Sequence, residues 1–443
     1  MRASHALTRV PVTFDEASLV PAAGLLPAAA LAQRVDLAGL IDDRLTLAAH
    51  GANSATKALS VIGTMLAGGD SIDDVAALRT GANARVFTDT RAPSTIGSWL
   101  RAFRWHNVRQ LDAVSRHLLR RLWAAGAGPA DLAAPMSIDI DSTIVQVYGR
   151  SKQGAAFGYT KVRGYHPQVA TLAQTGQVLF ARLRGGNAGA ARGAKTFLTE
   201  TISRVREAGA RGELTIRADS AFYSRNVLRT ARRLDVRFSI TVRQDKRIRA
   251  AIEAIDEQAW RPIPYWLSTP EVSGADVAET TYTAFAGTPQ AMQVRMIVRR
   301  VRPTPGSQLA LFTMFDYHAF VTDREGDFLG LEADHRRHAI VEQSIAELKS
   351  AGLAHLPSGR FFANAAWLAL TVMAHNLGRS VGILAGGRLA RATATTLRRC
   401  LFTIPGRIVR SARRDRLRLP DAWPWQHEFT AAMNRIAAIP APT

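Results

Sequence analysis

The stretch MSIDIDSTIVQVYG, residues 136–149, alternates apolar and polar side chains with the two-residue period of a β-strand. This alternation puts Ile138 and Ile140 on one face of the strand and Asp139 and Asp141 on the other. Paired acids commonly divide between binding a metal and supporting the ligand. We take Asp141 as the stronger ligand candidate and keep Asp139 as an alternative ligand or a support.

The segments that follow this strand predict a specific order of elements. Two further strands are joined by the turn QTGQ and form an antiparallel meander with the first. Helices and strands then alternate, giving the order strand, strand, strand, helix, strand, helix, strand. This is the order of the ribonuclease H-like α/β fold. The segments are QVATLA (168–173), VLFARLR (178–184), KTFLTETISRVREAG (195–209), ELTIRAD (213–219), SRNVLRTARRLD (224–235) and VRFSITVR (236–243).

Apolar spacing and charge divide the rest of the chain. The N-terminal part has apolar residues at helical spacing and many Arg, which favours a helical DNA-binding domain. Strand-like segments separated by Pro- and Gly-containing turns interrupt the core order. The C-terminal tail carries ten Arg between Arg388 and Arg418 and one acid, Asp415, and we expect it to be basic and helical. The expected units are 1–132 (helical DNA-binding domain), 133–256 (ribonuclease H-like core, first part), 257–330 (β-rich insertion), 331–385 (closing helices of the core) and 386–443 (basic C-terminal region).

The composition indicates a polyanionic partner. There are 57 Lys and Arg against 36 Asp and Glu, which gives a formal net charge of +21. Arg far outnumbers Lys, which suits forked contacts to phosphate, although the codon bias of a GC-rich genome accounts for part of the excess. Cys400 is the only cysteine, so an intramolecular disulfide is excluded. The longest apolar stretch, Ala363 to His375, is interpreted as a buried helix and not a membrane span, and we expect a cytoplasmic protein associated with the nucleoid.

Two further acids accompany Asp141. Asp219 ends the fourth predicted strand, which neighbours the first strand in this fold. Glu342 lies on a predicted helix of about 332–351, where the 100° step places it on one stripe with His335, His338 and Lys349. Converging carboxylates are the ligands with which two Mg²⁺ ions, or Mn²⁺ as a substitute, cleave a phosphodiester. Taken singly, Asp219 could be a helix cap, and Glu342 with Lys349 could be a surface pair.

The motifs SIDIDSTIV, GYTKVRGYHP, LRGGNA, IRADSAFYS and HRRHAIVEQSIAELK resemble, in order and spacing, the DDE-class transposases of bacterial insertion sequences. The resemblance is to the transposase-four group and especially its thirteen-eighty branch. It includes APSTIGSWLRAF near residue 92 and PGRIVRSARR near residue 405, so it covers nearly the whole chain. It implies that Asp141, Asp219 and Glu342 are the catalytic metal-binding acids, with Lys349 at the family spacing after Glu342.

The resemblance also points to DNA contacts, and one of them departs from the family pattern. His335 and His338 stand where the family has Tyr and Arg, and a free histidine is mostly neutral at pH 7. Arg336 or Arg337 could reach the phosphate instead. Related transposases hold an unstacked base on an aromatic residue of the insertion, and Trp260 and Trp266 are the candidates, although core packing is the more ordinary role. The remaining candidate phosphate contacts are Lys349, Arg407, Arg410, Arg413 and Arg414.

The sequence therefore predicts a cut-and-paste transposase that acts on double-stranded DNA. The resemblance implies that it binds terminal inverted repeats, hydrolyses strands at the element ends and joins the freed 3′ hydroxyls to target DNA. Pairing two ends would require a homodimer in a synaptic complex. Two alternatives stay open: an inactive copy that only binds DNA as a repressor, and a metal-dependent nuclease of the same fold.

Overall fold

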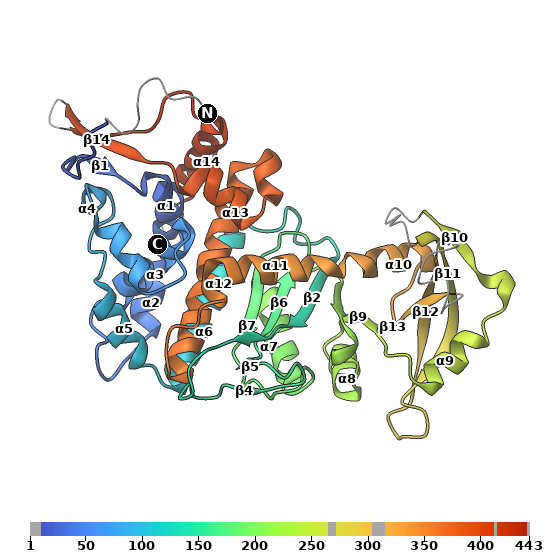
Figure 1. The fold of residues 1–443 in the computed structure, drawn as a ribbon. Helices are drawn as coiled ribbons and strands as arrows, with labels where there is room; N and C mark the ends of the chain where they lie inside the picture. Colours follow the sequence, from blue (N-terminus) through green and yellow to red (C-terminus); the bar gives the residue numbers. More distant parts are fainter. Residues whose placement is uncertain (1–9, 265–271, 304–314, 412–413, 441–443) are drawn as a thin grey trace.

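A computed structural model describes residues 10–264, 272–303, 315–411 and 414–440 of the 443-residue chain. The protein is mixed α/β and is built around one large mixed sheet. Figure 1 shows helices from both ends of the chain gathered at one end of the molecule, on the left, and the long β-hairpin of the sheet at the other end, on the right. A broken helix, coloured orange, runs between the two sides and passes over the strands at the centre.

Five strands make up one end of the nine-stranded sheet, in the order β7–β6–β2–β8–β9 from the edge strand β7 inward. β2, β6 and β7 are antiparallel, as the sequence predicts, whereas β8 and β9 run parallel to β2. Helices α7 and α8 connect β7 to β8 and β8 to β9, and their apolar side chains, such as Phe197 and Leu228, belong to the core of this sheet. The elements are β2 (Met136–Ser142), β6 (Gln168–Leu172), β7 (Val178–Arg182), α7 (Ala194–Glu207), β8 (Leu214–Ala218), α8 (Arg225–Arg233) and β9 (Arg237–Thr241).

The expected β-rich insertion continues the same sheet. Its last strand, β13, pairs with β9 through three residue pairs, from Phe320↔Thr241 to Thr322↔Ser239. The long strands β11 and β12 form a hairpin outside β13, and β10 lies at the edge. Continuous backbone hydrogen bonding therefore joins the insertion to the core. The elements are α9 (Lys246–Glu253), β10 (Arg261–Ile263), β11 (Val272–Ala284), β12 (Met292–Pro303) and β13 (Asp316–Thr322).

A second sheet, not anticipated from the sequence, lies between β2 and β6 along the chain. It has three short strands in the order β3–β5–β4: β3 (Val145–Gln146), β4 (Ala156–Phe157) and β5 (Arg163–Tyr165). Gly164 permits its close packing, because a Cβ there would lie 2.3 Å from the carbonyl oxygen of Val145. The period of two residues is too short-lived in strands of this length to be read from sequence.

The single helix expected over about 332–351 is longer and broken. It consists of α10 (Phe328–Arg336), a 3₁₀ turn (Arg337–Ala339), α11 (Ile340–Leu348) and a π-helical turn (Lys349–Leu353). The 3₁₀ turn advances about 120° per residue instead of about 100°, so side chains before and after it do not share one regular stripe. The predicted alignment of His335 with Glu342 and Lys349 is therefore not a simple helical face.

Helix α12 (Phe361–Ala385) is long and apolar enough to cross a membrane by length and composition, but 94% of its apolar window is buried inside the protein. It is the core helix that the sequence indicates. Helices from both ends of the chain pack around it. Leu31 of α1, Leu370 of α12 and Ile436 of α14 therefore belong to one hydrophobic cluster. The surrounding elements are α1 (Leu26–Arg34), α2 (Leu37–Arg44), α3 (Ser54–Ala67), α4 (Asn83–Val86), α5 (Pro93–Arg101), α6 (Trp105–Ala124), α13 (Ala394–Leu397) and α14 (Gln426–Ala438).

The basic C-terminal region is not wholly helical, which corrects the sequence prediction. β14 (Gly406–Ser411) and β15 (Arg414–Arg418) form a hairpin, and β1 (Leu19–Val20) from the N-terminal region pairs with β14. The β-branched pair Ile408 and Val409 favours an extended backbone, and Ile408 is buried against the N-terminal region. The two ends of the chain thus form one structural unit (Figure 1).

Candidate active site

Asp141 and Asp219 are neighbours at the end of two parallel strands. The register pairs Asp139 with Arg217 and Ile140 with Ala218, and the next positions along the two strands are Asp141 and Asp219. Each acid follows a small or branched apolar residue whose side chain is buried in the sheet. Alternation along both strands therefore puts the two acids on the same face, at the edge where β2 and β8 end.

The third acid, Glu342, interacts electrostatically with Asp141. Burial raises the pKa of Asp141 to about 6, and the carboxylates of Asp219 and Glu342 push it in the same direction. The backbone N–H of Ser142, which donates to Asp141 Oδ1 at 2.6 Å, acts against this shift, as does His338. Burial also raises the pKa of Asp219. The site thus holds negative charge that a cation would relieve.

Glu342 and Lys349 lie on the helix that passes over the strands at the centre of the molecule (Figure 1). Both belong to the broken helix, whose α11 segment packs against β2 and β6. Glu342 is exposed, and Lys349 is half-buried at the start of the π-helical turn. The Glu342 carboxylate raises the pKa of Asp141, whereas the Lys349 side chain makes no hydrogen bond or ion pair within the described residues.

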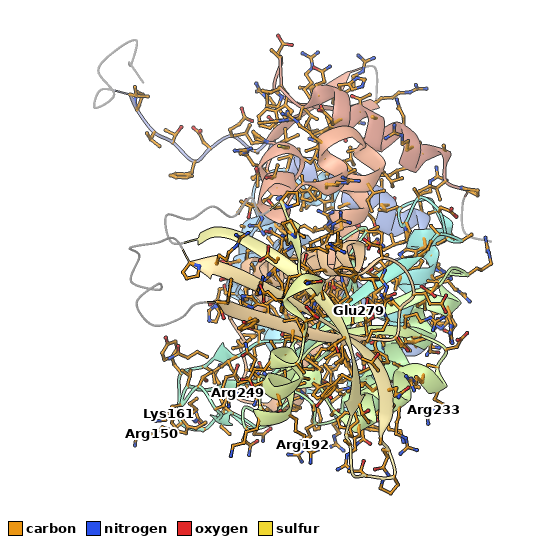
Figure 2. The ribbon with its side chains drawn as sticks, turned by 90° about the vertical axis from the view of Figure 1, so that its right-hand side faces the viewer. Arg150, Lys161, Arg192, Arg233, Arg249 and Glu279 are labelled. Carbon is orange, nitrogen blue, oxygen red and sulfur yellow. The ribbon has the colours of Figure 1, made fainter. Side chains whose placement is uncertain are left out.

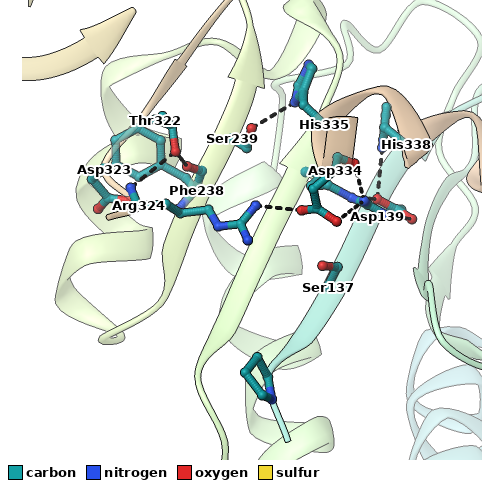
Figure 3. A network of polar contacts seen from close by, with 12 residues as sticks. Ser137, Asp139, Phe238, Ser239, Thr322, Asp323, Arg324, Asp334, His335 and His338 are labelled. Carbon is teal, nitrogen blue, oxygen red and sulfur yellow. Dashed lines mark hydrogen bonds and ion pairs between the residues drawn. The ribbon is translucent and has the colours of Figure 1, made fainter. Parts of the chain in front are cut away.

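Beneath the acids lies a buried network of charges (Figure 3). The Arg217 guanidinium donates to both oxygens of Asp139, at 2.7 and 2.8 Å, and these side chains are 1% and 0% exposed. A further nitrogen of Arg217 donates to the carboxylate of Asp334 at 3.1 Å and to its carbonyl oxygen. Asp334 also pairs with Arg324. The network ties β2 to β8 and both strands to α10, two residues before each acid.

Asp139 is therefore fully used as a support. Its Oδ1 lies 3.0 Å from His338 Nδ1 and its other oxygen is held by Arg217. A metal would have to displace these buried contacts, so the support role fits the structure better than the alternative ligand role. His338 is 16% exposed, contacts Asp139 of the buried network and lowers the pKa of both Asp141 and Asp219.

His335, a candidate phosphate contact from the sequence, is engaged by neighbouring side chains of the protein. Its ring nitrogens lie 2.8 Å from the Ser239 hydroxyl and 3.0 Å from the Thr241 hydroxyl, and its ring stacks on Phe320 at 4.0 Å. Burial holds the pKa of His335 well below its usual range, so the ring is neutral at pH 7. These contacts fasten β9 to β13 (Figure 3) and occupy both nitrogens that a phosphate would need.

The other predicted DNA contacts lie in several places. Arg336 pairs with Glu332 at 3.0 Å, whereas Arg337 is exposed on the 3₁₀ turn. Arg407 pairs with Glu16 at 3.0 Å, and Arg410 and Arg414 are exposed on the C-terminal hairpin. Trp260 is 9% exposed with the Arg300 guanidinium 4.3 Å from its ring centre, which makes it a packed residue and not an open base platform. Trp266 and Arg413 lie outside the described residues.

The donor set fits a hard divalent cation, although the carboxylates do not close around one as they stand. Three carboxylates at one edge provide the oxygen ligands that Mg²⁺ and Mn²⁺ prefer. Burial is the largest cause of the raised pKa of both Asp141 and Asp219, and a bound cation would favour their charged forms. In the part of the chain that the structure describes, no three His, Cys, Asp or Glu residues are spaced to hold an ion.

Sequence reasoning missed the buried network, although a signal for it was present. Arg217 precedes Asp219 by two residues, as Asp139 precedes Asp141, so opposite charges face each other wherever the two strands are paired in parallel. The pairing of Asp334 with Arg217 and of His335 with two hydroxyls depends on where α10 crosses the sheet. That placement is a tertiary property without a local signature.

Comparison with known proteins identifies a family. A family model described as "Transposase DDE domain group 1" matches residues 4–441. No curated protein matches the sequence significantly. Among solved structures, the chain is similar to a cryo-EM structure of a piggyBac transposase synaptic complex with hairpin DNA, at 12% sequence identity and a TM-score of 0.40, with coverage of 95% of this chain and 85% of that chain.

Proposed function

Because the chain belongs to the transposase DDE domain family, group 1, we propose that it is a DNA transposase whose acids Asp141, Asp219 and Glu342 cut and join DNA strands. The observation that carries the site assignment is the pairing of Asp141 with Asp219 at the ends of parallel strands, with raised pKa values. The strand order β7–β6–β2–β8–β9, antiparallel and then parallel, supports a ribonuclease H-like core.

Asp141, Asp219 and Glu342 would hold the divalent cations, Mg²⁺ or Mn²⁺, two per site. Bound there, such ions supply activation of the attacking oxygen and stabilisation of the leaving oxygen. The chain itself positions the acids. The ion pair of Asp139 and Arg217 fixes β2 against β8, and His338 contacts Asp139. Lys349 and the exposed Arg337 would contact the phosphates beside the scissile bond. The ammonium group of Lys349 would act as a point charge, and the guanidinium of Arg337 would donate two parallel hydrogen bonds.

The proposed substrates are the terminal inverted repeats of an insertion sequence and a target duplex. A net charge of +21 supports a polyanionic partner. The exposed Arg410 and Arg414 on the C-terminal hairpin and the basic N-terminal helices offer contacts outside the catalytic edge. Two copies would be needed to hold two ends at once, so we expect a homodimer on DNA.

The test is Mg²⁺-dependent cleavage of a DNA fragment that carries the element's own end. Asp141→Asn, Asp219→Asn and Glu342→Gln should each lower the rate by at least about 100-fold while the affinity for DNA is retained. Asp43→Asn, which removes an acid that is 74% exposed on α2, is the matched control and should cut normally. If the wild-type protein binds the end and never cuts it with either metal, the protein is a DNA-binding repressor instead.

A further inference from the structure

Exposed aromatic side chains concentrate on the small β3–β5–β4 sheet. In the described residues five aromatic side chains are strongly exposed, and three of them lie within residues 148–159: Tyr148 (79%), Phe157 (66%) and Tyr159 (79%). The other two are Phe14 and Trp105. Leaving several rings in water within one short segment costs hydrophobic free energy, so such a concentration marks a binding surface more often than chance exposure does.

The charge of this segment selects the kind of partner. Residues 148–163 contain four basic side chains and no acid. Arg150 and Lys161 are exposed, and in the view of Figure 2 both lie at the lower left of the molecule. Aromatic rings interleaved with Arg and Lys are the combination that binds unpaired nucleic acid, since rings stack on bases and cations follow the backbone.

The surface is held rigidly on the protein. Arg163 donates to the carbonyl oxygens of Gly149 and Arg150, the latter at 2.8 Å, which fixes the loop that follows β3. The backbone at Gly158 packs so closely on Gly186 that a Cβ at Gly158 would lie 2.5 Å from the Gly186 carbonyl oxygen. The rings are thus presented without the loss of conformational entropy that a loose loop would suffer on binding.

This sheet also adjoins the catalytic edge. β3 begins four residues after Asp141, and the Tyr159 ring lies 6.0 Å from that of His166. His166 is 2% exposed, and its Nδ1 lies 2.6 Å from the carbonyl oxygen of Ala188. Burial lowers the pKa of His166 and the Asp219 carboxylate opposes this, so the imidazole is within the field of the catalytic acids. Tyr159 is thus linked to Asp219 through His166.

We propose that the β3–β5–β4 sheet binds unstacked bases of a DNA strand next to the scissile phosphate, with Tyr148, Phe157 and Tyr159 as stacking surfaces and Arg150 and Lys161 as backbone contacts. The location beside the scissile phosphate rests on the proposed transposase function; the binding of unpaired DNA does not. A duplex hides its base faces within the stack, so these rings select unpaired or unstacked nucleotides.

The experiment measures the affinity of the full chain for a labelled single strand of about 12 nucleotides and for a duplex of the same length. Tyr148→Ala, Phe157→Ala and Tyr159→Ala are combined in one variant. At about 5-fold for each lost ring, we expect the combined variant to bind the single strand about 100-fold more weakly or worse, and duplex binding to change far less. The conservative variant Tyr148→Phe with Tyr159→Phe keeps the rings and should restore the single-strand affinity. Because the three rings are exposed, the thermal unfolding temperature should not change.

Cleavage of the element's end by wild-type protein is measured in parallel, so that the two proposals fail separately. Selective loss of single-strand binding supports the surface, whether or not the wild type cuts. An equal loss for both DNA forms, or no loss, overturns it even if the wild type cuts normally. Failure of the wild type to cut, with selective loss intact, refutes the transposase activity and leaves the surface as a single-strand binding site.

Discussion

Replacing Arg217 with methionine should lower the free energy of unfolding by about 3–5 kcal/mol, the cost of leaving a buried charge without its partner. The Arg217 side chain is 1% exposed and makes two of the three hydrogen bonds to Asp139, which is 0% exposed. Without it, Asp139 keeps His338 alone. Methionine fills a similar volume, so the lost free energy reports the charge and not a cavity.

Arg295 provides the matched control for this substitution. It also binds both oxygens of one carboxylate, that of Glu279 (labelled in Figure 2), with the second contact at 2.7 Å. The two side chains are 28% and 27% exposed, so water can replace the lost partner. Arg295→Met should therefore cost about 1 kcal/mol or less.

The assay is urea unfolding of wild type, Arg217→Met, Arg295→Met and the double variant Arg217→Met with Asp139→Leu. The double variant removes the stranded carboxylate and should recover at least half of the lost free energy. Under conditions where Arg217→Met is still folded, cleavage should fall about 10- to 100-fold, because the strands that carry the acids lose their clamp. Equal costs for the two single Arg variants would refute the reasoning.

Three other outcomes are expected. Burial raises the pKa of Asp112 to about 6, so the folded protein keeps this proton at pH values where the unfolded chain has released it. The free energy of unfolding should therefore fall as the pH rises from about 4 to about 6. Thermal melts across this pH range should show a less steep fall for Asp112→Asn than for the wild type. His335→Ala should lower the free energy of unfolding by about 2–3 kcal/mol without weakening DNA binding. Weaker DNA binding with an unchanged free energy of unfolding would instead support His335 as a phosphate contact. Arg410→Ala with Arg414→Ala should reduce the slope of log affinity against log salt by about 2, and an unchanged slope would remove the hairpin from the DNA interface.

The parts of the fold with a strong local period could be predicted from the sequence. The alternation around Asp139 and Asp141, and the helical spacing over 195–209, correspond to β2 and α7. The small sheet could not be predicted, because strands of two or three residues carry no readable period. The C-terminal hairpin was hidden because dense Arg suits a helix or a strand equally, and its pairing with β1 comes from the far end of the chain.

The site shows the same division between local and tertiary information. Asp141 and Asp219 follow from strand alternation and strand order, and the register places them together. The environment of His335 does not follow, since it is set by hydroxyls about 95 residues earlier and by a ring on β13. A regular helix was the simplest assumption for the segment that carries Glu342, and the 3₁₀ turn changes which side chains reach the sheet.

The narrow joint between β9 and β13 has an evolutionary consequence. Three residue pairs join β9 to β13, and the His335 ring contacts two hydroxyls of β9 and stacks on Phe320 of β13. Lengthening or shortening the outer hairpin leaves this joint intact, and the strands bearing Asp141 and Asp219 lie on the other side of it. Natural variation, or deliberate grafting, can thus change the length of this hairpin while the strand pairs that carry Asp141 and Asp219 stay the same.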